Sequence, residues 1–445
     1  MSERIVPRIL KGFRDLLPEE AAKRQQLIGE LCKVFSTASF VPIETPALEY
    51  SEILLGKGSG ETDKQMYRFS DNGGRDVALR FDLTLPLARY VSMHANELSF
   101  PLRRYHIAPV WRAEKPQKGR YREFLQCDFD IVGSHSPICD AEILLVAHRA
   151  LRSLGVEHEI RLSDRRILDT FFKNLGLGAK TQALLRSIDK LEKIGREAVG
   201  EELKIQSDLN EKQVADIFAF LELSSPTRSK WEIICEVAKA LGEEPSAKNG
   251  LSQLEGILAY LDSCSSPECF RLDLSVARGL DYYTGCVFET YAKGKEGVGS
   301  ISSGGRYDDL AGLYSKNSLP GVGASIGLDR VMLCLEDLHR NDREDPVMLT
   351  LSDRESAPEI FSIAELLRNR GIVAEVFHDF IKLSKQLRIA DRRGMRFVVL
   401  FTSDGLRESK TCSIKDLRNS LQHDEIPTSQ LADKLLEMRK NAKKN

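Results

Sequence analysis

The sequence lacks the features that most directly identify secreted, zinc-binding and membrane proteins. Its nine cysteines include no C-x-x-C pair and are odd in number, so neither a zinc site nor a disulfide framework is indicated. No apolar run approaches the roughly 20 residues of a membrane span, and the N-terminal segment contains no uninterrupted apolar stretch of the kind a signal peptide needs. We therefore expect a cytoplasmic protein with reduced thiols and no membrane partner.

An excess of charge of either sign is also missing. The chain has 64 Lys and Arg residues against 66 Asp and Glu residues, which gives a net charge of −2. No overall electrostatic field draws such a protein to nucleic acid, so any contact with RNA must use local basic patches. The length of 445 residues predicts two or three domains.

Short segments typical of β-strands occur on both sides of a long stretch typical of helices. Segments 78–85, 104–112 and 124–132 are typical of strands and are joined mainly by short loops, which predicts an antiparallel sheet. From about 167 to 263 the sequence is charged, Leu-rich and typical of helices, and β signals then resume. Beyond Pro346, short apolar strands alternate with helices, which predicts a compact α/β domain.

These patterns together predict an α+β domain on a mixed, mainly antiparallel sheet, interrupted by a helical insertion and followed by a smaller α/β domain. The predicted division assigns 1–166 and 264–340 to the α+β domain, 167–263 to the insertion and 341–445 to the last domain.

Polar and apolar residues alternate along the strand expected at 124–132. Successive side chains of a strand point to opposite faces, so one face of this strand is polar and the other joins the core. The polar face carries Gln126, Asp128 and Asp130, and the apolar face carries Cys127, Phe129 and Ile131.

A basic loop precedes this strand. Arginine forms bidentate bonds with phosphate, so the loop suits a polyphosphate tail, although a solvated basic hairpin is the alternative. Glu114 can accept a hydrogen bond from the amino group of a base, and Phe124 offers a stacking face. The basic residues are Arg112, Lys115, Lys118, Arg120 and Arg122.

A second polar alternation involves Arg80, Asp82 and Thr84, which are separated by apolar residues. A strand with this pattern either faces solvent or forms the floor of a ligand cavity. A cation, a carboxylate and a hydroxyl group together suit a small zwitterion, because the carboxylate can bind an ammonium group.

Small residues occupy every second position of the segment 321–327. This spacing is that of a strand and differs from the dinucleotide-binding fingerprint. A strand face without side chains lets a flat ring lie on the backbone, and close packing of a helix explains the pattern equally well. Arg330 favours the first interpretation, because its guanidinium group can cover the other side of the ring.

Two further glycine-rich segments contain residue types that suit a binding site. RGLDYYTG, residues 278–285, places Arg278, Tyr282 and Tyr283 beside glycines that permit close approach, although the tyrosines also suit an amphipathic strand. SSGGRYD, residues 302–308, is by itself a generic turn.

Taken together, these segments resemble the class II aminoacyl-tRNA synthetases and, within them, the histidyl-tRNA synthetase family. FVPIETPALEY, residues 40–50, resembles the first class motif, which forms a dimer interface. The hairpin at 105–124 resembles the second motif and GVGASIGLDR the third. RGLDYYTG and SSGGRYDDL resemble the two signatures particular to the histidine enzymes. The resemblance extends from about Lys11 to the C-terminus and is weakest in the helical insertion.

The resemblance implies a homodimer that acts on L-histidine, ATP and tRNA(His), with Mg²⁺ as counter-charge and with a catalytic domain followed by an anticodon-binding domain. ATP is implied to bind in a bent conformation on the antiparallel sheet. The implied ATP-binding residues are Arg112 at the α-phosphate, Arg120 at the γ-phosphate, Glu114 at the adenine amino group, and Phe124 and Arg330 on either side of the ring.

The resemblance also implies a pocket for histidine and a pair of catalytic arginines. Arg278 corresponds to the family's catalytic arginine at the α-phosphate, and Arg112 bridges that phosphate and the amino acid's carboxylate. Besides these two, the implied histidine ligands are Asp82, Thr84 and Gln126 for the ammonium group, Asp130 and Tyr283 for the imidazole, and Tyr282 lining the same pocket.

The chain departs from the common bacterial pattern at RFDLTLP, where many bacterial enzymes have RPEGT, and this variant resembles the eukaryotic and archaeal type. The C-terminal domain lacks the glycine usually found after one strand, so we assign no anticodon-reading residues. There are two alternatives to a synthetase. One is the regulatory subunit of a short-form ATP phosphoribosyltransferase, which keeps a synthetase-like core, and the other is an RNA-binding module without catalysis. The four arginines at 112, 120, 278 and 330 favour the synthetase.

Overall fold

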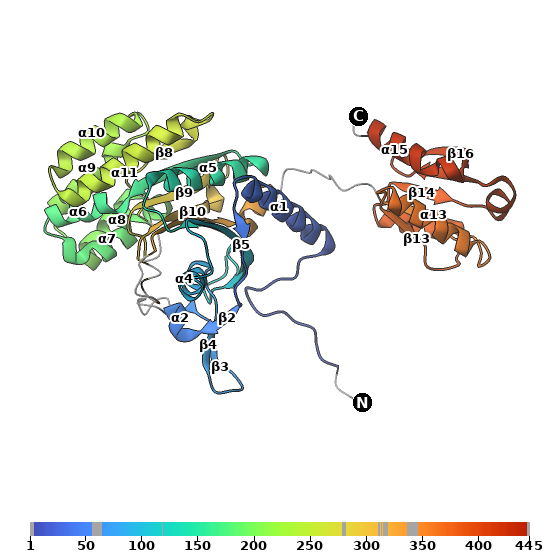
Figure 1. The fold of residues 1–445 in the computed structure, drawn as a ribbon, viewed down its shortest axis with the longest axis horizontal. Helices are drawn as coiled ribbons and strands as arrows, with labels where there is room; N and C mark the ends of the chain where they lie inside the picture. The colour runs from blue at the N-terminus through green and yellow to red at the C-terminus, as the bar shows by residue number, and fades with distance from the viewer. Residues whose placement is uncertain are drawn as a thin grey trace. The chain divides into compact units, whose positions relative to one another are not determined.

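The computed structural model describes residues 4–55, 65–117, 119–277, 282–309, 312, 314, 319–335 and 346–442. The chain forms two compact units, Met1–Leu338 and His339–Asn445, each of which is described by itself (Figure 1). The predicted division of the first unit at 166 and 263 stays a prediction.

A mixed eight-stranded sheet lies at the centre of the first unit. Its five inner strand pairs are antiparallel and its two outer pairs are parallel, so the predicted fold class is confirmed. In spatial order the strands are β1 (Val41–Pro42), β5 (Leu102–Trp111), β6 (Glu123–Val132), β11 (Gly321–Gly327), β10 (Ser300–Tyr307), β9 (Cys286–Ala292), β7 (His158–Asp164) and β8 (Phe270–Leu272).

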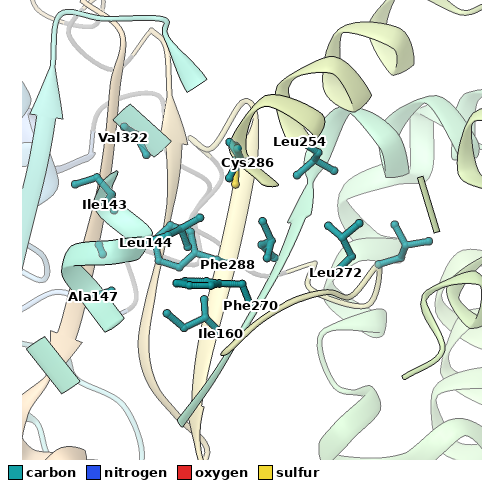
Figure 2. Close-up of a cluster of buried hydrophobic side chains, with 14 of the residues drawn as sticks. Ile143, Leu144, Ala147, Ile160, Leu254, Phe270, Leu272, Cys286, Phe288 and Val322 are labelled. Atoms are coloured by element: carbon teal, nitrogen blue, oxygen red, sulfur yellow. The ribbon is translucent and has the colours of Figure 1, made fainter. Parts of the chain in front are cut away.

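One face of this sheet is covered by the helices α1 (Pro18–Thr37) and α5 (Pro137–Ser153). The apolar residues of β6, which are Cys127, Phe129 and Ile131, join the core there as their alternation predicts. Figure 2 shows Ile143, Leu144 and Ala147 of α5 beside Ile160, Phe270, Phe288 and Val322 of the strands.

The opposite face of the sheet holds α4 (Thr84–Met93), whose Leu87 and Val91 pack against Leu102 and Val132. Next to α4 lie the short helix α2 (Ser51–Leu55) and a small antiparallel sheet, and α12 (Leu328–Cys334) follows directly after β11. The strands of the small sheet, in spatial order, are β2 (Leu48–Tyr50), β4 (Asp76–Leu79) and β3 (Arg68–Ser70).

The strand predicted over 78–85 is wrong in its second half. β4 ends at Leu79, and a helix begins at Thr84. The carboxylate of Asp82 accepts a hydrogen bond from the backbone N–H of Leu85 at 3.1 Å, which satisfies a donor of the first helical turn. Pro86 suits the same turn, because its missing N–H would have no helical partner there.

The segment between β7 and β8 is helical, as predicted from its sequence. Two of its helices begin with a capping box, in which Asn210 and Gln213, and likewise Ser229 and Glu232, exchange side-chain and backbone hydrogen bonds. The helices are α6 (Arg165–Asn174), α7 (Thr181–Ile188), α8 (Leu191–Ser207), α9 (Glu211–Leu221), α10 (Lys230–Leu241) and α11 (Pro245–Asp262).

The second unit has the predicted alternation of strands and helices around a five-stranded sheet with its own core. The sequence interpretation missed the antiparallel hairpin at its end and the last helix. The elements are β12 (Val347–Leu349), α13 (Ala357–Asn369), β13 (Ala374–Val376), α14 (Leu383–Arg392), β14 (Phe397–Leu400), β15 (Thr411–Asp416), β16 (Leu421–Pro427) and α15 (Leu431–Ala442). Across the described parts of both units, no helix has the length and apolarity needed to span a membrane.

Candidate active site

A polar surface lies on the face of the sheet opposite α1 and α5. Residues directly opposite each other on antiparallel strands share a face, so the register of β5, β6 and β11 defines this surface. Three cross-strand rows run over these strands: Arg104, Asp130 and Gly323; His106, Asp128 and Ser325; and Ala108, Gln126 and Gly327.

Asp130 is held by groups inside the protein. Its carboxylate forms an ion pair with Arg104 at 2.6 Å and accepts a hydrogen bond from the Tyr307 hydroxyl group at 2.6 Å. A Cβ atom at Gly323 would lie 1.9 Å from an oxygen of Asp130, so glycine is needed there to make room for the carboxylate. The guanidinium group of Arg104 has no exposed surface.

Two further carboxyl groups, those of Asp82 and Asp128, are buried beside this pair. Burial raises the pKa of Asp82 to about 6, against the opposing effects of the Leu85 backbone N–H and Arg112. Burial also raises the pKa of Asp128 to about 7, although the positive charge of Arg104 acts in the opposite direction. This part of the site therefore takes up protons near neutral pH.

Tyr282 and Tyr283 lie next to these carboxyl groups, with their ring centroids 4.9 Å apart. Burial raises the pKa of both phenols, and the charges of nearby aspartates add to this effect, so both remain neutral hydrogen-bonding groups. The side chain of Thr84 has the opposite, smaller effect on the pKa of Tyr282. Arg278, the predicted catalytic arginine, lies outside the described residues.

A cavity of about 710 Å³ opens from this polar surface toward α12. It is large enough for a nucleotide-sized ligand. Seven of the residues predicted to bind ATP or histidine line it: Arg112, Glu114, Arg120, Phe124, Gln126, Tyr283 and Arg330.

Cationic side chains surround this cavity and are held by neutral or acidic neighbours. Arg112 donates to the carbonyl oxygen of Phe81 at 2.9 Å, and its guanidinium carbon lies 5.2 Å from the centre of the Phe124 ring. Arg120 forms an ion pair with Glu114. Because these contacts already hold both cations at the cavity wall, little reorganisation is needed for an anion to replace their present partners.

Arg330 lies on α12 and donates to the carbonyl oxygen of Ser300 at 2.6 Å. The open floor of the cavity beside it is Gly327, where a Cβ atom would have only the carbonyl oxygen of Ile301 within 4 Å, at 3.7 Å. Of the small residues at 321, 323, 325 and 327, the cavity is lined by those at 325 and 327. A Cβ atom at Gly321 would instead lie 2.3 Å from the Tyr307 ring.

The sequence interpretation assigned no role to three residues of this site: Arg104, Tyr307 and Asp128. The sequence does indicate that Asp128 belongs to the site, because it lies on the same face of β6 as Gln126 and Asp130. Arg104 and Tyr307 reach Asp130 only through the pairing of β5, β6, β11 and β10, and no local sequence pattern indicates that pairing.

The site combines cationic and acidic side chains. The cavity wall carries Arg112, Arg120, Lys193 and Arg330 together with the carboxyl groups of Glu114, Asp189, Glu192, Glu296 and Asp329. Asp82, Asp128 and Asp130 are buried at the polar surface beside it. Such an arrangement can hold a polyanion together with a zwitterion whose carboxylate points to the arginines and whose ammonium group points to the aspartates.

Comparisons with known proteins agree with this chemistry. Residues 12–331 match the family model described as histidyl-tRNA synthetase, and residues 346–438 match the one described as anticodon binding domain. The chain is 43% identical over 439 residues to a histidine–tRNA ligase of Rhodopirellula baltica, covering 97% of this chain and 98% of that protein. It is 42% identical over 453 residues to a histidine–tRNA ligase of Treponema denticola, covering 98% and 99%.

Solved structures share the fold. A histidyl-tRNA synthetase from Nostoc sp. PCC 7120 has a TM-score of 0.84 and 30% identity, covering 98% of this chain and all of that one. A structure described as an ATP phosphoribosyltransferase regulatory subunit/histidyl-tRNA synthetase from Bacillus halodurans has a TM-score of 0.73 and 22% identity, covering 87% and 97%. The second likeness concerns the fold alone.

The raised pKa of Asp128 predicts how stability depends on pH. The folded state keeps a proton that the unfolded chain releases near pH 3.8, so stability falls as pH rises from about 4 to about 7. Asp128→Asn removes this titration. Between pH 5 and pH 8 the free energy of unfolding of the variant should therefore rise relative to wild type by about 3 kcal/mol.

Urea denaturation of both proteins at the two pH values measures this difference. Glu157→Gln, which changes an exposed carboxylate of the same unit, is the control and should leave the pH dependence unchanged. A difference between Asp128→Asn and wild type that is the same at both pH values would contradict the prediction.

Proposed function

Because the chain belongs to the histidyl-tRNA synthetase family, we propose that this site joins L-histidine to ATP, forming histidyl-adenylate and pyrophosphate, and then transfers histidine to the 3′ end of tRNA(His). The overall activity is that of a histidine–tRNA ligase, with histidine, ATP and tRNA as substrates. The observation that carries the proposal is that Arg112, Arg120 and Arg330 line the same cavity, beside three buried aspartates.

In this proposal ATP occupies the cavity of about 710 Å³. The adenine ring lies over Gly327 between Phe124 and Arg330, and Glu114 accepts a hydrogen bond from its amino group. Arg120 exchanges its ion pair with Glu114 for one with the γ-phosphate. A phosphate group accepts two parallel hydrogen bonds from arginine, as a carboxylate does, and it carries more negative charge. Arg112 binds the α-phosphate.

Histidine lies next to ATP on the buried polar surface. Its carboxylate contacts Arg112 and Arg278, and its ammonium group contacts Asp82, Thr84 and Gln126. The ring contacts Asp130 and Tyr283, and Tyr282 closes the pocket around it. These roles are supported by the position of Gln126 and Tyr283 at the cavity wall and by the burial of Asp82 and Asp130 next to it.

Activation then needs positioning and charge stabilisation more than acid–base chemistry. A carboxylate oxygen of histidine attacks the α-phosphorus, the bond to the β-phosphate oxygen breaks, and pyrophosphate leaves with its electron pair. Arg112 and Arg278 stabilise the negative charge that accumulates on the α-phosphate. In the second step a ribose hydroxyl group of the tRNA attacks the carbonyl carbon of the adenylate, and AMP leaves.

Mg²⁺ is part of the proposal as a companion of ATP. Within the described parts of the chain, no three His, Cys, Asp or Glu residues gather into a metal site. Mg²⁺ commonly binds phosphate oxygens and waters with one or two carboxylates, so it can enter with the triphosphate. When bound, it neutralises phosphate charge.

The proposal includes a homodimer of the class II type that works in the cytoplasm. β1 is an edge strand of the large sheet and β2 is an edge strand of the small one. Both carry exposed apolar residues, which are Val41 on β1 and Leu48 and Tyr50 on β2. A second copy of the chain would cover these residues and pair with the edge at β1. All nine cysteines are free thiols, which suits a reducing compartment.

The first prediction of the proposed function concerns the overall reaction. Purified protein should exchange labelled pyrophosphate into ATP when histidine is added, because adenylate formation is reversible. No other amino acid should support exchange. A histidine sensor without catalysis would bind histidine and give no exchange, and exchange driven by a different amino acid would reject the assignment of the pocket.

The second prediction separates the two halves of the site by adding one methyl group to each. Gly323→Ala must displace the Asp130 carboxylate, so it should raise KM for histidine about tenfold or more and leave KM for ATP nearly unchanged. Gly327→Ala has room in the protein and extends into the cavity, so it should raise KM for ATP instead. Exchange kinetics at varied concentrations of each substrate measure both effects, and the opposite pattern would contradict the placement of the ligands.

The third prediction concerns assembly. Sedimentation equilibrium should give twice the mass of the chain, and Val41→Asp should shift the mass toward that of a monomer, because an unpaired charge would be buried in the interface. Val373 of the second unit is 52% exposed, compared with 50% for Val41, so Val373→Asp is a matched control that should remain a dimer. A wild-type monomer at micromolar concentration would reject the interface.

A further inference from the structure

The buried polar surface contains more carboxyl groups than cations. Asp82, Asp128 and Asp130 are 2%, 3% and 3% exposed. Among the described residues, two buried cations lie near them. Arg104 forms an ion pair with Asp130, and Arg80 donates hydrogen bonds to the carbonyl oxygens of Pro109 and Thr45. Buried carboxylates without a partner are costly, so the other two carboxyl groups favour either a proton or a cation from outside.

Asp128 lies at the centre of this surface. Along β6 it is two residues from both Gln126 and Asp130, and across the strands it lies opposite His106 and Ser325. One of its oxygens is buried and has no hydrogen-bond partner among the described residues. The side-chain oxygen of Gln126 is also buried and has no hydrogen-bond partner among the described residues. The amide nitrogen of Gln126 donates to the Ser325 hydroxyl group at 2.7 Å.

Neither neighbour of Asp128 on β5 neutralises it fully. Burial, together with the charges of Arg104 and Arg80, lowers the pKa of His106 to about 3, so this imidazole is neutral at physiological pH. Arg104 is already paired with Asp130. The site therefore presents an acceptor oxygen, at the floor of the proposed amino-acid pocket, that the protein itself leaves without a donor.

We propose that Asp128 is a further substrate ligand, whose carboxylate binds the ammonium group of histidine together with Asp82. This inference rests on the proposed function and deepens it, because the family resemblance assigned no role to Asp128. The ammonium group fits better than the imidazole for two reasons. It carries a full positive charge and three donors, and Asp130 on the imidazole side is already engaged by Arg104 and Tyr307.

The same arrangement couples binding to protons. With a pKa of about 7, Asp128 holds a proton in a large fraction of the free protein at neutral pH. The incoming ammonium group takes the place of that proton, so binding releases it. The charged and titratable groups around Asp128 are Arg104 and His106 on β5, Asp130 on β6, Arg80 and Asp82 before α4, and the phenols of Tyr282 and Tyr283, with the Ser325 hydroxyl group on β11 opposite it.

Two analogues of histidine test which group Asp128 binds. Histidinol keeps the ammonium group and loses the carboxylate, and imidazole propionate keeps the carboxylate and loses the ammonium group. Asp128→Asn should weaken histidinol about 10- to 100-fold, which is the effect of losing a charge-assisted hydrogen bond. It should leave imidazole propionate and ATP within about twofold of wild type.

Calorimetry supplies a readout that a merely structural role would not change. At pH 7, in buffers of different ionisation enthalpy, histidine binding to wild type should release a fraction of a proton beyond what the ligand's own imidazole releases. Asp128→Asn should release clearly less, because only the ligand's imidazole and the small protonated fraction of Asp82, whose pKa is about 6, then contribute. Ser325→Ala is the second variant. Losing its hydrogen bond raises the pKa of Asp128 further, so histidine affinity should begin to rise at higher pH than in wild type.

Equal loss of both analogues in Asp128→Asn, or proton release identical to wild type, would overturn the role of Asp128. If Asp128→Asn fails to fold, an unchanged pH profile in Ser325→Ala overturns it instead. These failures differ from failure of the proposed function, which would appear as wild-type protein that gives no histidine-dependent pyrophosphate exchange.

Discussion

A guanidinium group with no access to water, that of Arg104, is the interaction on which the rest of the site depends. Its ion pair with Asp130 places a positive charge beneath the polar face of the sheet, where burial alone would drive the neighbouring carboxyl groups to their neutral forms. Breaking such a buried pair leaves an uncompensated charge and costs about 3–5 kcal/mol. The pair therefore preserves both the fold of the central strands and the acidic character of the pocket.

This buried charge also explains why the pocket suits a zwitterion. Asp82 and Asp128 have pKa values of about 6 and 7, so small changes in their surroundings decide whether they are charged. A ligand that brings a positive charge to the aspartates and a negative charge to Arg112 satisfies both ends at once. Tyr282 and Tyr283 keep their protons and contribute hydrogen bonds without adding charge.

The parts of the fold that follow from local periodicity were predictable from the sequence. β6 was predictable because apolar and polar side chains alternate from Leu125 to Ile131. A shift by one residue would place Cys127, Phe129 and Ile131 in the polar site. The segment after β4 was not, because Arg80, Asp82 and Thr84 alternate like a strand over too few residues to exclude a helix start. There the hydrogen bond from the Leu85 N–H to Asp82 and the packing of Leu87 and Val91 determine the outcome.

The candidate site was predictable only as a set of residue types. Sequence spacing brings Gln126, Asp128 and Asp130 to one face, but it does not show that Arg104 and Tyr307 engage Asp130 and leave Asp128 with an unpaired oxygen. That difference comes from strand register, and Gly323 makes it possible because any side chain there would displace the Asp130 carboxylate. Because residue 323 of β11 is glycine, Asp130 can bind Arg104 and Tyr307, and Asp128 is left available to a ligand.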